Sequence, residues 1–156
     1  QNILNIFFEF YNNDKNINLI YIKPHPVNNV KNLFYIRPLL KYKNVRLVHD
    51  NIDKYLQSVD IVVSSNSIAC LEALFLEIPI INIKNISGLD FSPFPDLIKS
   101  NIIFSIKNSR ELSLQIEDIY KSVLDTNYEK NNLVNKENLF CPLNEKNIKK
   151  LFNLNL

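Results

Sequence analysis

The sequence predicts an α/β fold in which a Rossmann-like parallel sheet is covered by helices on both faces. Short β-branched runs alternate along the chain with segments whose apolar residues recur at helical spacing. The predicted strands are apolar throughout instead of alternating in polarity, which is typical of parallel strands buried on both faces. With 156 residues, of which 46% are hydrophobic, the chain can bury one core of this kind.

The first half of the chain supplies two predicted strands and two predicted helices. Residues 3–11 have the pattern of the end of a helix. "INLIYIK" (residues 17–23) is a β-branched run that Pro24 stops, as expected of a buried strand that ends in a turn. "VRLVHD" (residues 45–50) is a second short strand, and residues 52–59 place apolar residues at helical spacing.

The second half continues the alternation. "DIVVSS" (residues 60–65) is a third strand, and "SIACLEALFLE" (residues 67–77) is a helix of good helix formers that ends before Pro79. "PIINI" (residues 79–83) and "NIIFSI" (residues 101–106) are the fourth and fifth strands.

The loop between the last two strands, residues 84–100, contains Phe91 and Phe94 beside two prolines. This combination fits a semi-rigid loop near a ligand cleft or a partner, and packing of the loop on the domain's own core is the alternative. After the fifth strand, Ser109 is expected to cap a long helix that runs to about Leu124. We therefore expect one domain over residues 1–129 and a helical tail over residues 130–156.

Composition excludes several function classes. The formal net charge of +2 gives no electrostatic case for nucleic-acid binding. The chain has one glycine, Gly88, whereas a dinucleotide fingerprint or a Walker phosphate loop needs several within a short span. Cys70 and Cys141 match neither a disulfide framework nor a zinc site, so we expect two buried thiols, no metal and no cofactor.

The chain is expected to be cytoplasmic, because no apolar run reaches the length that spans a bilayer and the N-terminus lacks a signal-peptide pattern. Near the end, "EKNIKKLF" places lysines close to apolar residues. This pattern fits a solvated helix face, with a weak membrane-surface helix as the alternative. The chain begins with Gln1 and contains no Met, so we expect it to be part of a longer protein.

Two polar clusters follow predicted strands, where ligands bind in open parallel sheets. The cluster Ser64–Ser67 lies between the third strand and its helix, where backbone N–H groups and the side chains of Ser65, Asn66 and Ser67 can hold a phosphate. An ordinary helix cap with two polar loop residues is the alternative, because Ser and Asn are common at such positions. Glu72, farther along the same helix, can accept hydrogen bonds from a ribose or can be a solvated surface charge.

The other cluster, Lys23-Pro24-His25-Pro26, follows the first strand. Two prolines restrict the backbone around His25, whose imidazole can donate to a phosphate or protonate a leaving group. Lys23 adds a positive charge for phosphate, or lies along the strand end with its charge in water. His49, at the end of the second strand, is a weaker candidate.

The order of a strand, "KPHP", a strand, a helix, a strand, "SSNSIACLEAL" and "EIPIINI" resembles the C-terminal, nucleotide-sugar-binding half of GT-B glycosyltransferases. Among them, it looks closest to the bacterial enzymes of capsule and surface polysaccharide synthesis. Bacterial sialyltransferases and polysialyltransferases of this type have an His-Pro motif and a Ser-rich motif in this half. His25-Pro26 and Ser64–Ser67 match these motifs, and the resemblance covers roughly residues 17–124.

The resemblance implies a role for each matching residue. His25 would contact the donor phosphate and act on the leaving nucleotide, Ser65–Ser67 would hold the phosphate, and Glu72 would lie near the ribose. It also implies that a nucleotide-sugar donor, with CMP-sialic acid as the first guess, gives its sugar to a glycan acceptor at the inner face of the membrane. The acidic base motif of this family belongs to the N-terminal acceptor-binding domain, which this sequence lacks, so we expect the chain to bind without turnover.

Three other classes stay open. Wall teichoic acid polymerases that use CDP-glycerol share the general layout, as do the non-hydrolysing UDP-GlcNAc 2-epimerases. The epimerases usually have glycines within the Ser motif, and this chain has none there. A non-catalytic interaction module of Rossmann-like fold is the third class.

Overall fold

A computed structural model describes residues 2–11, 17–25, 34, 36–65, 67–84, 94 and 100–124. It is a small α/β domain with parallel strands. In chain order its elements are α1 (Asn2–Tyr11), β1 (Ile20–Ile22), the 3₁₀ helix η2 (Leu39–Lys41), β2 (Val45–Leu47), α2 (Asp53–Leu56), β3 (Val62–Ser64), α3 (Ala69–Phe75), β4 (Ile80–Ile83), β5 (Ile103–Ile106) and α4 (Ser109–Leu124).

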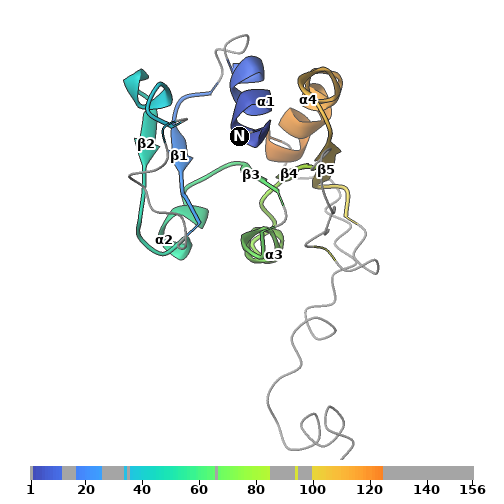
Figure 1. Ribbon diagram of the computed structural model, residues 1–156. Coiled ribbons are helices and arrows are strands. Elements are labelled where there is room, and N and C mark those ends of the chain that lie inside the picture. Colours follow the sequence, from blue (N-terminus) through green and yellow to red (C-terminus); the bar gives the residue numbers. More distant parts are fainter. Residues whose placement is uncertain are drawn as a thin grey trace, which may run out of the picture.

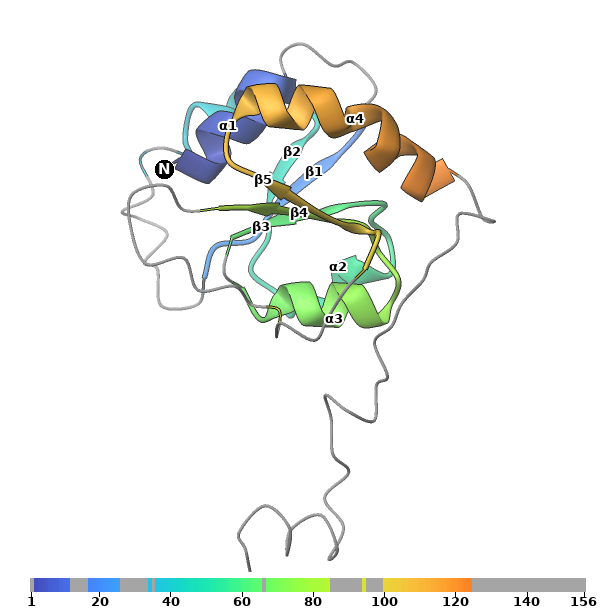
Figure 2. The ribbon, with the colours of Figure 1, turned by 90° about the vertical axis from the view of Figure 1, so that its right-hand side faces the viewer.

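The strands form two parallel sheets. β1 pairs with β2, with Ile22 opposite Leu47. The other sheet has the order β3-β4-β5, with Ser64, Asn82 and Ser105 in one register row. All five predicted strands are therefore present and parallel, but among the described strands no ladder joins β1 to β3. Figure 2 shows β1 and β2 inclined to the other three strands, which accounts for the interruption.

Helices cover the strands from two sides. In Figure 1, α1 and α4 lie on one side of the strands and α2 and α3 on the other. The contacts agree, because α1 packs on α4, and Leu56 of α2 shares a buried cluster with Cys70 and Leu74 of α3. The prediction of helices on both faces is thus confirmed, and the layering is compatible with a Rossmann-like fold.

Three apolar clusters make up the core. The α3 cluster lies between α2, α3 and the three-stranded sheet, and the α4 cluster lies on the opposite face of that sheet. The α1 cluster joins α1 to the two-stranded sheet. α1 also connects the two sheets, because Phe8 belongs to the α1 cluster and Ile6 packs against the α4 cluster.

Two predicted helices are shorter than their patterns indicated. α2 ends at Leu56 instead of Val59, and the Ser58 hydroxyl donates to the Tyr55 carbonyl (3.0 Å), which gives the backbone an alternative to the helix. α3 ends at Phe75. There, Glu77 has a left-handed φ of 58°, and the N–H groups of Glu77 and Ile78 donate to the carbonyls of Leu74 and Ala73. This is a Schellman motif without the usual glycine.

One sequence-based prediction was wrong in detail. The cap of α4 is Asn108 instead of Ser109, because the Glu111 N–H donates to Asn108 Oδ1 (2.9 Å) and Glu111 Oε2 accepts from the Lys107 N–H (2.8 Å). Phe94 is buried in the α3 cluster, which agrees with the alternative in which this residue packs on the domain's own core.

Several predictions lie outside the described residues. They concern Pro26, Asn66, Phe91, Cys141 and the tail from residue 130 to 156. Within the described part, no helix is both long and apolar enough to cross a membrane.

Candidate functional site

The two predicted polar clusters leave the strand layer on the same side. Figure 2 shows β1, β3 and β4 ending towards the left, so the segment Lys23–His25 and the turn that begins at Ser64 both start from that edge. Ligands of open parallel sheets bind beyond this carboxyl edge. The fold therefore brings the two clusters to one edge of the domain, although they are about 40 residues apart in the sequence.

The turn from Ser64 to α3 is tied to the helix by hydrogen bonds. Ser67 Oγ accepts from the Ala69 N–H (3.3 Å), and the Ser67 carbonyl accepts from the Cys70 N–H (3.0 Å). Ser67 thus performs the capping role that was the structural alternative to phosphate binding. Its hydroxyl proton stays available for a ligand, because the hydroxyl acts as an acceptor in the cap. Ser65 is half-buried in the same turn.

Cys70, in α3, contacts this turn from its buried side. Its thiol is fully buried, and burial raises the pKa of the Cys70 thiol, against the smaller lowering by hydrogen bonds from the Ser64 hydroxyl and the Ser67 backbone. Because a nucleophilic cysteine needs an accessible thiolate, Cys70 is not a candidate nucleophile. Its contacts join both ends of the turn to the first turn of α3.

Lys23 and His25 lie at the open end of β1, where Lys23 is half-buried and His25 is exposed. The Tyr21 ring contacts the Tyr55 ring of α2 (5.0 Å between centroids), so β1 packs against α2 just before this segment. Val62 packs against the α3 cluster, which places Ser64 on the α3 side of its sheet. The two polar clusters therefore follow strands that pack against α2 and α3.

The remaining sequence candidates are more peripheral. Glu72 is exposed in the first turn of α3, while Cys70, Ala73 and Leu74 make up the buried side of that helix. His49 is exposed after β2. β2 ends two residues before His49, and His25 follows β1, so the two imidazoles follow neighbouring strands.

Asn82 was missed by sequence reasoning. It lies in β4, whose four residues are all buried, and its own exposure is 3%. Among the described residues its Oδ1 atom has no hydrogen-bond partner, and a buried acceptor without a donor costs about 1–3 kcal/mol. The signal in the sequence is the single polar letter in the buried run "IINI", which is inconspicuous because asparagine is abundant throughout this chain.

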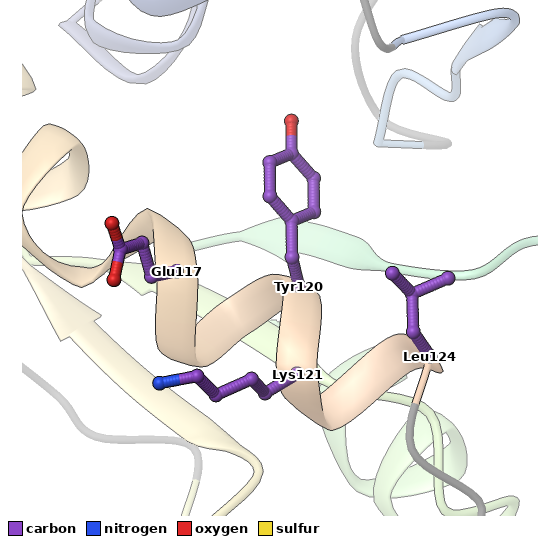
Figure 3. A pocket seen from close by; sticks show the side chains of 4 residues that line it. All are labelled: Glu117, Tyr120, Lys121 and Leu124. Atoms are coloured by element: carbon purple, nitrogen blue, oxygen red, sulfur yellow. The ribbon is translucent and has the colours of Figure 1, made fainter.

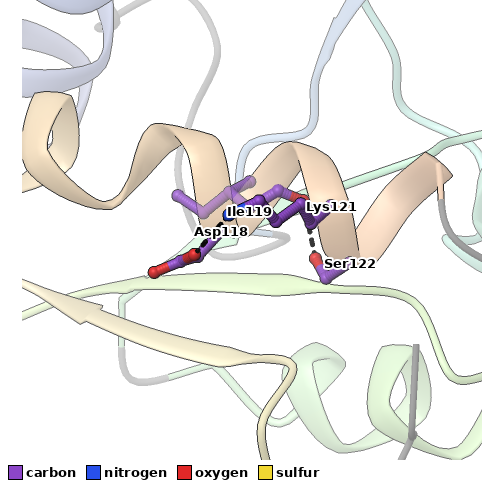
Figure 4. Close-up of polar contacts among 4 residues, drawn as sticks. All are labelled: Asp118, Ile119, Lys121 and Ser122. Carbon is purple, nitrogen blue, oxygen red and sulfur yellow. Dashed lines mark hydrogen bonds and ion pairs between the residues drawn. The ribbon is translucent and has the colours of Figure 1, made fainter.

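An open groove along α4 lies elsewhere. Figure 3 shows its lining residues Glu117, Tyr120, Lys121 and Leu124, all of which come from that one helix. Figure 4 shows the neighbouring contacts of α4, in which Lys121 pairs with Asp118 (3.5 Å) and the Ser122 hydroxyl donates to the Ile119 carbonyl (2.6 Å). Because α4 covers the face opposite α3, this groove is separate from the polar clusters.

Neither a metal site nor similarity to known proteins adds a further assignment. Among the described residues, no three His, Cys, Asp or Glu side chains come together in an arrangement that could hold a metal ion. The chain matches no protein-family model, and comparisons with curated proteins and with solved structures find no significant match.

Proposed function

We propose that this chain is the nucleotide-sugar-binding half of a GT-B glycosyltransferase that acts in bacterial surface or capsular polysaccharide synthesis. The observation that carries the proposal is the common edge reached by the segment Lys23–His25 and the turn Ser64–Ser67. One cluster supplies cationic and imidazole groups, and the other supplies hydroxyl and amide donors. Together they suit a diphosphate or a phosphodiester, which presents oxygen acceptors only.

In this proposal the residues divide the work of donor binding. Ser65, Asn66 and Ser67 donate to the phosphate oxygens, and Lys23 neutralises part of their charge. His25 donates to the phosphate as the bond to the anomeric carbon breaks, so that the leaving nucleotide does not depart with its full charge. Glu72 accepts from the ribose hydroxyls, for which its exposed position in the first turn of α3 leaves room.

The acceptor hydroxyl must lose its proton as the anomeric centre is attacked, and we assign this step to no carboxylate of the described part of the chain. We therefore assign the base and the acceptor site to another domain of a longer protein. The donor that we place first is CMP-sialic acid, followed by CDP-linked and UDP-linked donors. We also propose that the sugar is transferred at the inner face of the membrane, where the growing glycan is assembled.

The test is a thermal-shift titration of this chain with CMP, CDP, UDP and GDP. A ligand present at about 100 times its Kd stabilises the native state by about 2.7 kcal/mol, which raises Tm by several degrees in a domain of this size. We expect one nucleotide, CMP first, to give this shift and His25→Ala to lose most of it.

The matched control is His49→Ala, which removes the only other imidazole of the chain, at an exposed position after the neighbouring strand. We expect this variant to keep the shift of the unmodified chain. Equal shifts in the two variants would contradict the assignment of His25. The absence of a shift with every nucleotide would favour the non-catalytic interaction module.

The full-length protein separates transfer from isomerisation. Release of free UDP from UDP-GlcNAc without any acceptor would favour the epimerase class over the transferase. Activity that disappears on chelation would contradict the metal-independent mechanism that we propose for the transferase.

A further inference from the structure

The strongest unexplained feature of the domain is the buried amide of Asn82. β4 is the central strand of its sheet, and its other three residues are fully or nearly fully buried isoleucines. An apolar residue of similar shape at position 82 would remove the unpaired acceptor and leave the rest of the strand unchanged. Asn82 thus lowers the stability of the core, and no hydrogen bond of its Oδ1 atom within the described structure offsets this loss. Buried polar groups of this kind occur at functional sites.

The position of Asn82 connects it to the candidate site. In the sheet register Asn82 lies directly beside Ser64, the first residue of the turn Ser64–Ser67. Both side chains point to the same face, because Ile80 and Val62, two residues earlier in each strand, both pack in the α3 cluster. Side chains at such paired positions on neighbouring strands are close enough to interact.

The Ser64 hydroxyl has two neighbouring acceptors, the Cys70 sulfur and, by strand pairing, the Asn82 amide oxygen. In the described structure it interacts with the Cys70 sulfur, which is a weak acceptor. The carbonyl oxygen of Asn82 is the stronger acceptor, and it has no donor. Rotation of Ser64 about χ1 would transfer the hydroxyl hydrogen bond from the sulfur to the amide and would turn the lone pairs of Ser64 Oγ.

We propose that Asn82 is a positioning residue of the nucleotide site, which fixes the Ser64 hydroxyl in the ligand-bound orientation. When the Ser64 hydroxyl donates its hydrogen bond to Asn82 Oδ1, Ser64 Oγ presents only acceptor lone pairs at the carboxyl edge. It then binds a hydroxyl group of the ligand, from the ribose or from the transferred sugar, and does not bind a phosphate. This inference rests on the proposed nucleotide-binding function and adds the part of the ligand that Ser64 recognises.

The experiment is a double-mutant cycle in this chain with Asn82→Leu, Ser64→Ala and both together. Its readouts are Tm and the Kd of whichever of CMP, CDP, UDP and GDP binds the unmodified chain. We expect Asn82→Leu to raise Tm by ~3 °C, because the unpaired acceptor is gone. The same variant should weaken nucleotide binding by about fivefold, and Ser64→Ala should do the same. The double variant should be no weaker than either single variant, because the two residues act as one unit.

Binding of inorganic pyrophosphate and of the nucleotide-sugar shows which part of the ligand carries the hydroxyl group that Ser64 recognises. Inorganic pyrophosphate should bind the Asn82→Leu variant and the unmodified chain equally, because it carries no hydroxyl group for Ser64. A loss for the nucleotide alone assigns the ribose, whereas a loss that appears only with the nucleotide-sugar assigns the transferred sugar. Ser105→Ala is the matched control, since Ser105 lies in the same row on the other side of Asn82 and is exposed.

Several outcomes would overturn the proposal. Unchanged binding of both the nucleotide and the nucleotide-sugar by Asn82→Leu would do so, as would effects of the two single substitutions that add in the double variant. A lower Tm in both Asn82→Leu and the smaller Asn82→Val would mean that the amide is paired within the fold. If the unmodified chain binds none of the four nucleotides, the proposed function fails first and this inference fails with it.

Discussion

The two sheets of this domain differ in how deeply their strands are buried. All four residues of β4 are buried in the three-stranded sheet, and seven large apolar side chains around that sheet are almost completely inaccessible: Leu74, Ile80, Ile83, Ile102, Ile106, Leu112 and Ile119. The edge strands of that sheet differ, since β5 has two buried residues and β3 is half-buried. In the two-stranded sheet, β1 and β2 contribute one buried residue each. Aromatic rings complete its packing, such as Phe8 against Tyr11. Stability is therefore concentrated in one sheet, although the candidate site takes residues from both.

This difference matters for the site because its two halves are held differently. The turn Ser64–Ser67 is fixed by hydrogen bonds to α3 and by the buried Cys70. The segment Lys23–His25 extends from the less buried sheet, and His25 at its end is exposed. Low-stability regions open locally at a small cost in free energy. We expect the Ser turn to be preorganised and the His25 segment to adjust when a ligand binds.

The difference in burial between the two sheets is tested most strongly by the same isoleucine-to-alanine substitution in each sheet. Ile80 and Ile20 each begin a strand, but Ile80 is completely buried and Ile20 is only partly buried. We expect Ile80→Ala to lower the free energy of unfolding by about 3–4 kcal/mol and Ile20→Ala by about 1–2 kcal/mol. Urea unfolding followed by circular dichroism measures both values. Equal losses would show that the two sheets contribute alike and would remove the basis of the comparison.

The second prediction concerns the connection from α3 to the central strand β4. Glu77 has a left-handed backbone that a side chain with a β-carbon disfavours, so Glu77→Gly should raise the free energy of unfolding by about 1 kcal/mol. The same change in the middle of a helix has the opposite sign, and Glu117→Gly in α4 should cost about 1 kcal/mol. Thermal unfolding of the two variants provides the comparison. A lower Tm for Glu77→Gly would mean that contacts of the Glu77 side chain outweigh the backbone strain.

Much of this fold could be predicted because periodicity and helix boundaries are local properties of a sequence. The five strands and the helix after Ser109 follow from apolar runs and from the prolines that end them. Side-chain contacts decided the rest. The cap of α4 is Asn108 instead of Ser109 because Asn108 Oδ1 accepts from the Glu111 N–H, and tertiary packing buries Phe94 in the core.

The candidate site shows the same limit. Its two clusters could be found because polar residues after apolar strands are visible in the sequence. The link between Ser64 and Asn82 depends on strand register, which no short stretch of sequence encodes. The interruption between β1 and β3 was equally hidden, because it results from the inclination of whole strands.

The smallest expected effect concerns the thiol beneath the Ser turn. Burial raises the pKa of Cys70 in the native state, so the unfolded chain loses the thiol proton at a lower pH than the folded chain does. Above pH 9.0, the ordinary pKa of a thiol, the native state therefore binds more protons and stability falls as the pH rises. Between pH 8 and pH 9.5 the unmodified chain should lose ~0.5 kcal/mol more than Cys70→Ala does.

Cys70→Ala is informative even though it opens a cavity, because the cavity lowers stability by the same amount at every pH while the proton linkage changes only the slope. Urea unfolding of both chains at several pH values gives the two slopes, and tyrosine and lysine titration in this range cancels between them. Parallel slopes would mean that the thiol ionises as easily in the folded chain as in water. Solvent would then reach the turn Ser64–Ser67 through the site of Cys70. The contrast between a preorganised turn and an adjustable His25 segment would be lost.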